Sequence, residues 1–146
     1  MMVEHSYDEI LTMITKFSAV EEKIKKDVTA ELSVIGASTT KEIKNDMRKP
    51  KSGRFYVYRK RAHRASAPGE SPAVMSGRLI GSVGYKTNFF NRLEVGAGSN
   101  DIIYAKFLEK GTKRMRPRPY LANFFEENTK NMHETFSGII RGAFKW

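Results

Sequence analysis

The chain contains no cysteine, which excludes disulfide bonds, thiol catalysis and cysteine-based zinc sites and suits a reducing cytoplasm. It also lacks any run close to the roughly 20 apolar residues that a membrane span needs. The first residues, Met1–His5, have neither the basic region nor the apolar region of a signal peptide. We therefore expect a protein that is made and used without crossing a membrane.

The side-chain groupings that support catalysis are lacking as well. His5, His63 and His133 lie far apart and have no neighbour at a ligand spacing, so we expect no metal site. Glu126 and Glu127 are adjacent on a predicted helix and diverge, unlike an acid/base pair in a shared cleft. The serines lie in no nucleophile-elbow motif. The sequence predicts neither an enzyme nor a cofactor.

Acidic residues are absent from one segment, and this uneven charge says more than the total of +10 over 146 residues. Residues 1–46 have a net charge of −3, whereas residues 47–69 contain eight Lys or Arg and no acid. Such a segment predicts a localised positive surface that meets phosphates or an acidic partner. The alternative is a solvated arm with no partner.

A long amphipathic helix is expected at the N-terminus. Ser6 and Glu9 have the spacing of a capping box, and we expect a kink or loosened turn at Gly36 and the end of the helix before Pro50. One apolar stripe follows a spacing of three to four residues, broken only at Glu21; it comprises Ile10, Ile14, Phe17, Ile24, Val28, Leu32 and Ile35.

The segment 54–59 has the alternation of a strand, with a loop expected over 65–72. Its aromatic residues lie between basic ones, which is also the pattern of a stacking platform for single-stranded nucleic acid. We favour the strand, because alternating aromatics are ordinary strand formers, and a basic ribbon still binds duplex phosphates without reading bases.

The remainder predicts a short helical turn at 76–80, strands over 82–87 and 92–97, and a short helix over 102–109 followed by Gly111. Pro119 is expected in the first turn of a last amphipathic helix. The fold class is therefore α+β, with both long helices packed on a small antiparallel β-sheet and a projecting basic β-arm. We expect a single domain with a long helix over 1–49, the basic arm and loop over 50–74, and the sheet and C-terminal helix over 75–146.

Three motifs follow one another along the chain. The first is a Pro-Gly-Glu segment that leads into Ser-Gly-Arg-Leu, the second is Tyr-Ala-x-x-Leu-Glu-x-Gly-Thr, and the third is Arg-Pro-Tyr-Leu. Their order and spacing over about residues 7 to 132 resemble those of the tailed-phage neck and tail-completion proteins. The residues that match most directly are His63, Pro68, Gly69, Glu70, Pro72, Gly77, Arg78, Leu79, Tyr104, Glu109, Gly111, Arg118 and Pro119.

The resemblance implies a structural virion protein at the head–tail junction, assembled in the host cytoplasm into a six- or twelve-fold homo-oligomeric ring that lets DNA pass. The implied partners are other neck, head-completion and tail-tube or terminator proteins, and genomic double-stranded DNA in the lumen. Glu109 would pair with Arg78 or Arg118, within or between subunits. The arm would either line the DNA channel or clasp an acidic ring, through Arg54, Arg59, Lys60, Arg61 and Arg64. The alternative function is non-sequence-specific nucleic-acid binding.

Overall fold

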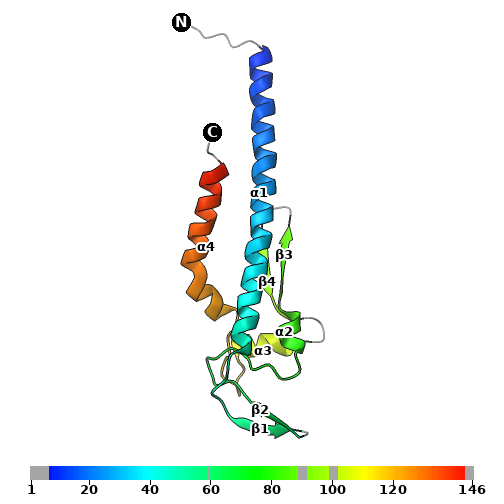
Figure 1. Cartoon of the computed structure of the whole chain (residues 1–146), viewed down its shortest axis with the longest axis vertical. Helices are drawn as coiled ribbons and strands as arrows, with labels where there is room; N and C mark the ends of the chain where they lie inside the picture. The colour runs from blue at the N-terminus through cyan, green and yellow to red at the C-terminus, as the bar shows by residue number, and fades with distance from the viewer. Residues whose placement is uncertain (1–6, 59, 89–91, 99–101, 144–146) are drawn as a thin grey trace.

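The computed structural model describes residues 7–58, 60–88, 92–98 and 102–143. The molecule is elongated, and one helix, α1 (Tyr7–Arg48), runs along most of its length (Figure 1). The other elements are β1 (Phe55–Tyr58), β2 (Arg61–Arg64), α2 (Arg78–Ser82), β3 (Gly84–Asn88), β4 (Arg92–Gly96), α3 (Tyr104–Lys110) and α4 (Ala122–Ala143). The predicted α+β class is confirmed.

Helix α1 contains 42 residues and is about 63 Å long at 1.5 Å per residue. It ends two residues before Pro50, as predicted. The expected kink at Gly36 is wrong, because the helix continues through this residue. Gly36 is buried, and a Cβ atom there would lie 2.4 Å from a ring carbon of Tyr85. Glycine is needed for the close approach of a β-hairpin. Ser6, the expected cap, lies outside the described residues.

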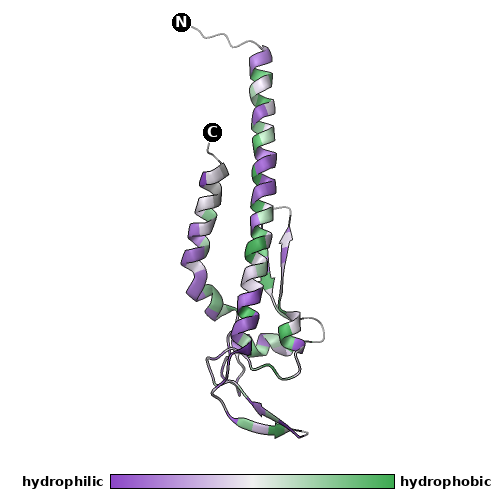
Figure 2. Ribbon diagram, viewed as in Figure 1, coloured by the Kyte–Doolittle hydropathy of each residue, from purple (hydrophilic) through white to green (hydrophobic). Residues whose placement is uncertain are grey.

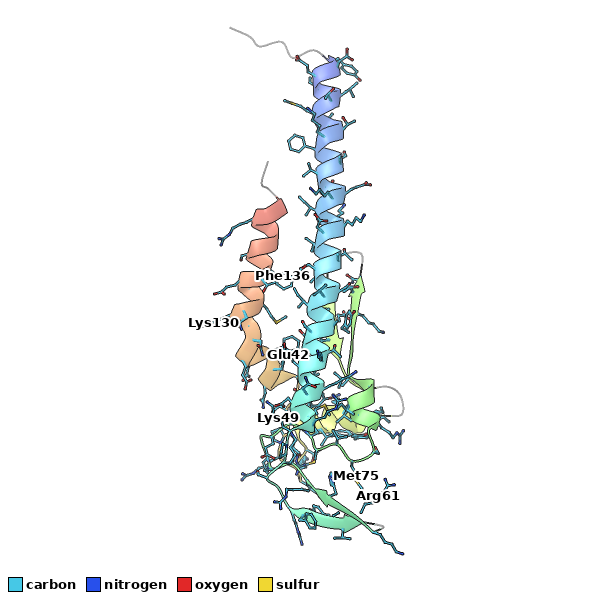
Figure 3. The ribbon with its side chains drawn as sticks, viewed as in Figure 1. Glu42, Lys49, Arg61, Met75, Lys130 and Phe136 are labelled. Atoms are coloured by element: carbon cyan, nitrogen blue, oxygen red, sulfur yellow. The ribbon has the colours of Figure 1, made fainter. Side chains whose placement is uncertain are left out.

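That hairpin is formed by the antiparallel strands β3 and β4, with Tyr85 opposite Val95 and Thr87 opposite Leu93. Both predicted strands are confirmed, and Leu93 and Val95 are half-buried. Helix α4 runs along the other side of α1 in the opposite direction (Figure 1), and its Phe136 points toward α1 (Figure 3). The C-terminal half of α1 is therefore flanked by a hairpin and a helix.

The core lies at the C-terminal end of α1. Ile43 and Met47 are 1% exposed, and around them pack Leu79, Ile80, Val83, Ile102, Ala105 and Tyr120. The N-terminal half of α1 extends well beyond this core (Figure 1). No helix within the described residues is both long and apolar enough to cross a lipid bilayer.

At the end of the molecule away from the N-terminus of α1, β1 and β2 form a second, separate hairpin that projects from the body (Figure 1). The sequence predicted a projecting basic ribbon with a strand over 54–59, but it assigned no second strand, and the structure supplies β2 as that partner. Its residues pair in register with β1, with Tyr56 opposite His63 and Val57 opposite Ala62. Lys60 in the connecting turn has a φ of 64°, a left-handed conformation typical of tight hairpin turns.

Candidate functional site

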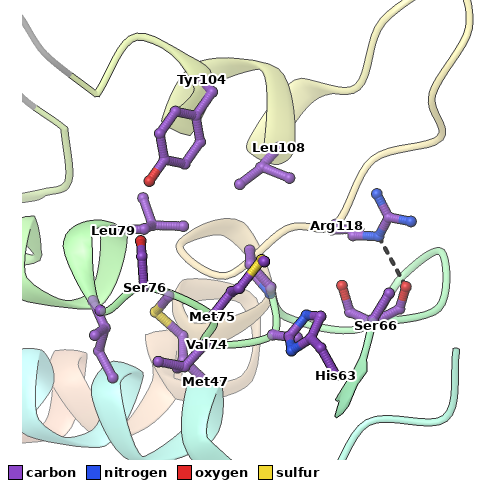
Figure 4. Close-up of a pocket in the computed structure, with 15 residues that line it drawn as sticks. Met47, His63, Ser66, Val74, Met75, Ser76, Leu79, Tyr104, Leu108 and Arg118 are labelled. Atoms are coloured by element: carbon purple, nitrogen blue, oxygen red, sulfur yellow. Dashed lines mark hydrogen bonds between the residues drawn. The ribbon is translucent and has the colours of Figure 1, made fainter. Parts of the chain in front are cut away.

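Part of each motif lines one groove at the base of the molecule, with a volume of about 310 Å³ (Figure 4). Segments far apart in the sequence line it: the end of α1, strand β2, the loop before α2, and helix α3. Most of its lining is apolar, and Met75 at its edge is 61% exposed. Of the residues singled out in the sequence, His63, Pro72, Gly77, Leu79, Tyr104 and Arg118 line this groove.

Glu70 organises the Pro-Gly-Glu loop beside the groove. Its carboxylate accepts hydrogen bonds from the Ser52 hydroxyl at 2.5 Å, the Ser52 amide at 3.2 Å and the Ala67 amide at 2.8 Å. The Ser52 hydroxyl, followed by the two amides, holds the pKa of Glu70 below its ordinary value, because these donors favour the charged form. Glu70 thus joins the loop to the start of the arm.

The third motif is attached to the same loop. The Arg118 guanidinium donates to the Ser66 carbonyl at 3.0 Å, shown as a dashed line in Figure 4, and the Gly69 amide donates to the Pro117 carbonyl at 3.0 Å. The Asn123 side chain of α4 donates to the Gly69 carbonyl at 3.2 Å. Motifs about 50 residues apart therefore form one connected unit.

Glu109 has a different role from the expected ion pair. Its carboxylate accepts from the backbone amides of Tyr120 at 3.0 Å, Leu121 at 3.2 Å and Ala122 at 2.8 Å. These amides lie at the start of α4, so Glu109 caps that helix from a distance in sequence. The prediction for Pro119 is wrong, because α4 begins at Ala122 and Pro119 lies in the extended segment before it.

Two glycines with positive φ lie in the turns beside this unit. Gly77 precedes α2 with a φ of 79°, and Gly111 follows α3 with a φ of 73°. A Cβ atom at Gly111 would also lie 2.8 Å from the Met115 carbonyl oxygen. The expected place of Gly111 directly after the short helix is confirmed. Arg78 is exposed at the start of α2, next to the groove.

Arg61 and Arg64 lie on strand β2 of the β1–β2 hairpin, and Lys60 lies in its turn. Directly opposite residues share a face of a hairpin, so one face contains Phe55, Val57, Ala62 and Arg64. All four are exposed, and the Arg64 guanidinium lies 5.9 Å from the centre of the Phe55 ring. We name these four residues the outer face. Arg59 lies outside the described residues.

The other hairpin face contains Tyr56, Arg61 and His63 and is turned toward the groove, which His63 lines. Arg61 extends into the space below Met75 (Figure 3). Arg54, just before β1, lies 5.5 Å from the centre of the Tyr56 ring. Arginines therefore flank aromatic rings on both faces, an arrangement that cation–π attraction favours.

A second apolar surface lies on the N-terminal half of α1, and sequence reasoning did not separate it from the core. Ile10, Met13, Ile14 and Phe17 are about half exposed or more. At 100° per residue they fall within about a third of the helix circumference. Figure 2 shows apolar residues recurring there where no other element covers the helix. We name these four residues the tip stripe. It continues the pattern of the buried stripe below, so the sequence carries no signal for where burial stops.

Sequence reasoning also missed a polar link at the end of α1. The Lys51 ammonium donates to the Ser71 hydroxyl at 2.6 Å and to the Asp46 carbonyl at 3.0 Å. Burial lowers the pKa of Lys51, although nearby carboxylates oppose this. The link holds the arm against α1. No periodicity or motif in the sequence indicates this link, because its three residues are up to 25 positions apart.

Comparison of the chain with protein-family models, curated proteins and solved structures finds no match.

Proposed function

We propose that this protein is a structural component of the head–tail junction of a tailed phage, a neck or tail-completion protein. It assembles into a ring that joins head to tail and lets DNA pass. The observation that carries the proposal is the convergence of the three motifs, which Glu70, Arg118 and Glu109 hold together at the base of α1. Residues matched by order alone thus act as one structural unit.

The exposed surfaces support assembly in particular. The chain presents a projecting hairpin and a helix end whose apolar residues lie open to solvent. Exposed apolar surface of this kind marks sites of association between proteins. A surface that pairs with a different surface of the next copy generates a ring when the rotation closes. The ring copy number proposed is six or twelve.

The test is removal of the encoding gene from the phage, followed by electron microscopy of the lysate. We expect DNA-filled capsids and free tails that remain unjoined. Restoring the gene should restore tailed particles. Intact, tailed, DNA-filled particles in normal numbers without the protein would overturn the proposal.

Non-sequence-specific nucleic-acid binding is the second candidate, and the basic hairpin is the observation that favours it. Eight Lys or Arg within residues 47–69 give the charge that binds phosphates. Counterions released on binding make the affinity of such a protein fall steeply with salt. Titration of the purified protein with duplex DNA over a salt series separates the two: the second candidate requires tight, steeply salt-dependent binding by a monomer or dimer.

A further inference from the structure

The arm and the tip stripe are complementary in charge and in apolar character. The acids nearest the tip stripe are Asp8 and Glu9 at its N-terminal side and Glu21 and Glu22 beyond its other end, where Glu21 pairs with Lys25. The arm lies in a segment with no acid among residues 47–69. Each surface also exposes large apolar side chains, with Phe17 66% exposed on the tip and Val57 70% exposed on the hairpin.

The two surfaces do not meet within one molecule. The tip stripe lies near the N-terminal end of α1, whereas the hairpin projects beyond its C-terminal end (Figure 1). A helix of 42 residues keeps them apart, by several tens of ångströms at 1.5 Å per residue.

The molecule already contains one example of the packing that would join them. Lower on α1, the β3–β4 hairpin covers the helix, with Tyr85 and Leu93 against Gly36. The tip of α1 has no such cover among the described residues, and the outer face of the β1–β2 hairpin has no helix against it. One helix segment and one hairpin thus remain unpaired at opposite ends.

We propose that the arm of each copy packs its outer face on the tip stripe of the next copy. Phe55 and Val57 cover apolar side chains of the tip, and Arg64 lies beside its carboxylates. The contact joins two different surfaces, so it propagates in one direction and closes into a ring or extends as a filament. The inference rests on the proposed ring and names its subunit contact; it assigns the arm to protein and not to DNA.

Disulfide trapping tests this directly, because the chain has no cysteine of its own. One preparation contains Val57→Cys and a second, carrying a size tag, contains Ile14→Cys. We expect the oxidised mixture to shift to a band of mixed dimer, and the double variant to form a ladder of longer covalent oligomers. Both positions are exposed, so circular dichroism should show unchanged folding.

Val34→Cys is the matched control for the tip position. It lies on the same helix and is 61% exposed, but outside the tip stripe. We expect it to give no mixed dimer with Val57→Cys. Dimers of Ile14→Cys with itself, or no product in the mixture, would overturn the inference. The inference would also be overturned if Arg61→Glu and Arg64→Glu abolished duplex-DNA binding while no cross-link formed.

The two proposals fail in different ways. If no cross-link forms but the gene-deletion lysate contains unjoined heads and tails, the neck function stands and the subunit contact is wrong. If the cross-link forms but deletion leaves tailed particles intact, the contact stands and the neck function is wrong.

Discussion

Glu109 shows how a single side chain connects two of the motifs. It caps α4 by accepting from three backbone amides. Glu109→Ala leaves these amides without their acceptor, and we expect a loss of about 1–3 kcal/mol in the free energy of unfolding. Glu126→Ala is the control, because that residue is exposed on the same helix, and it should change stability by less than about 0.5 kcal/mol. Urea unfolding measures both; equal effects would remove the capping role.

Tyr120 is 3% exposed, at the start of α4. Burial, followed by the Glu109 and Tyr104 charges, raises its pKa from the ordinary 10.0 to about 12. A raised phenol pKa stabilises the fold fully below pH 10, and this contribution is lost as the pH rises through about 12. We expect a phenolate absorbance step near pH 12 that Tyr120→Phe removes. A variant with the same titration curve above pH 10 would contradict this assignment.

Gly36 determines how closely an element packs on α1. A Cβ atom there would lie 2.4 Å from Tyr85 and 2.8 Å from Leu93. We expect Gly36→Ala to destabilise the protein by about 1–3 kcal/mol through overpacking. Gly138→Ala in α4 is the control, since its Cβ atom meets nothing within 4 Å; in a helix it should stabilise by about 0.5–1 kcal/mol. Thermal unfolding should therefore shift in opposite directions. A stabilising Gly36→Ala would show that the hairpin does not pack this closely.

The arm is expected to be the first site of proteolysis in the free protein. Its hairpin forms a separate two-stranded sheet, and such hairpins have little stability alone. Limited trypsin digestion should cut first between Arg48 and Arg64, with mass spectrometry identifying the sites. Protection of the whole segment in the isolated subunit would contradict a projecting arm.

The elements that local pattern controls were predictable from the sequence. The apolar stripe and Pro50 defined α1, and alternation defined β3 and β4. Strand β2 was missed because Arg-Ala-His-Arg has no β-branched residue, and its pairing depends on the turn at Lys60. Pro119 was misplaced because the cap of α4 comes from Glu109, more than ten residues earlier. Features that depend on distant contacts leave no local signal.

The candidate site divides in the same way. The motif residues were identified from their order, but their groove depends on how four distant segments pack. The loop held by Glu70 and Ser52 joins residues 18 apart in sequence. The tip stripe and the buried stripe have one periodicity, so only the structure separates the exposed part of the stripe from the core.

The whole molecule consists of a small core from which a helix end and a basic hairpin project in opposite directions (Figure 1). In such a shape, the two ends make few contacts with the rest of the same molecule. Repeated head-to-tail contact between copies would cover both ends at once, and it makes a closed ring when the rotation between copies closes.

The proposed ring can be tested by an electron-microscopic reconstruction of the virion neck. We expect a closed ring of six or twelve copies, in which each α1 helix, about 63 Å long, has its tip against the hairpin of the next copy. A reconstruction that contains no copy of the protein, or one asymmetric copy, would contradict the account.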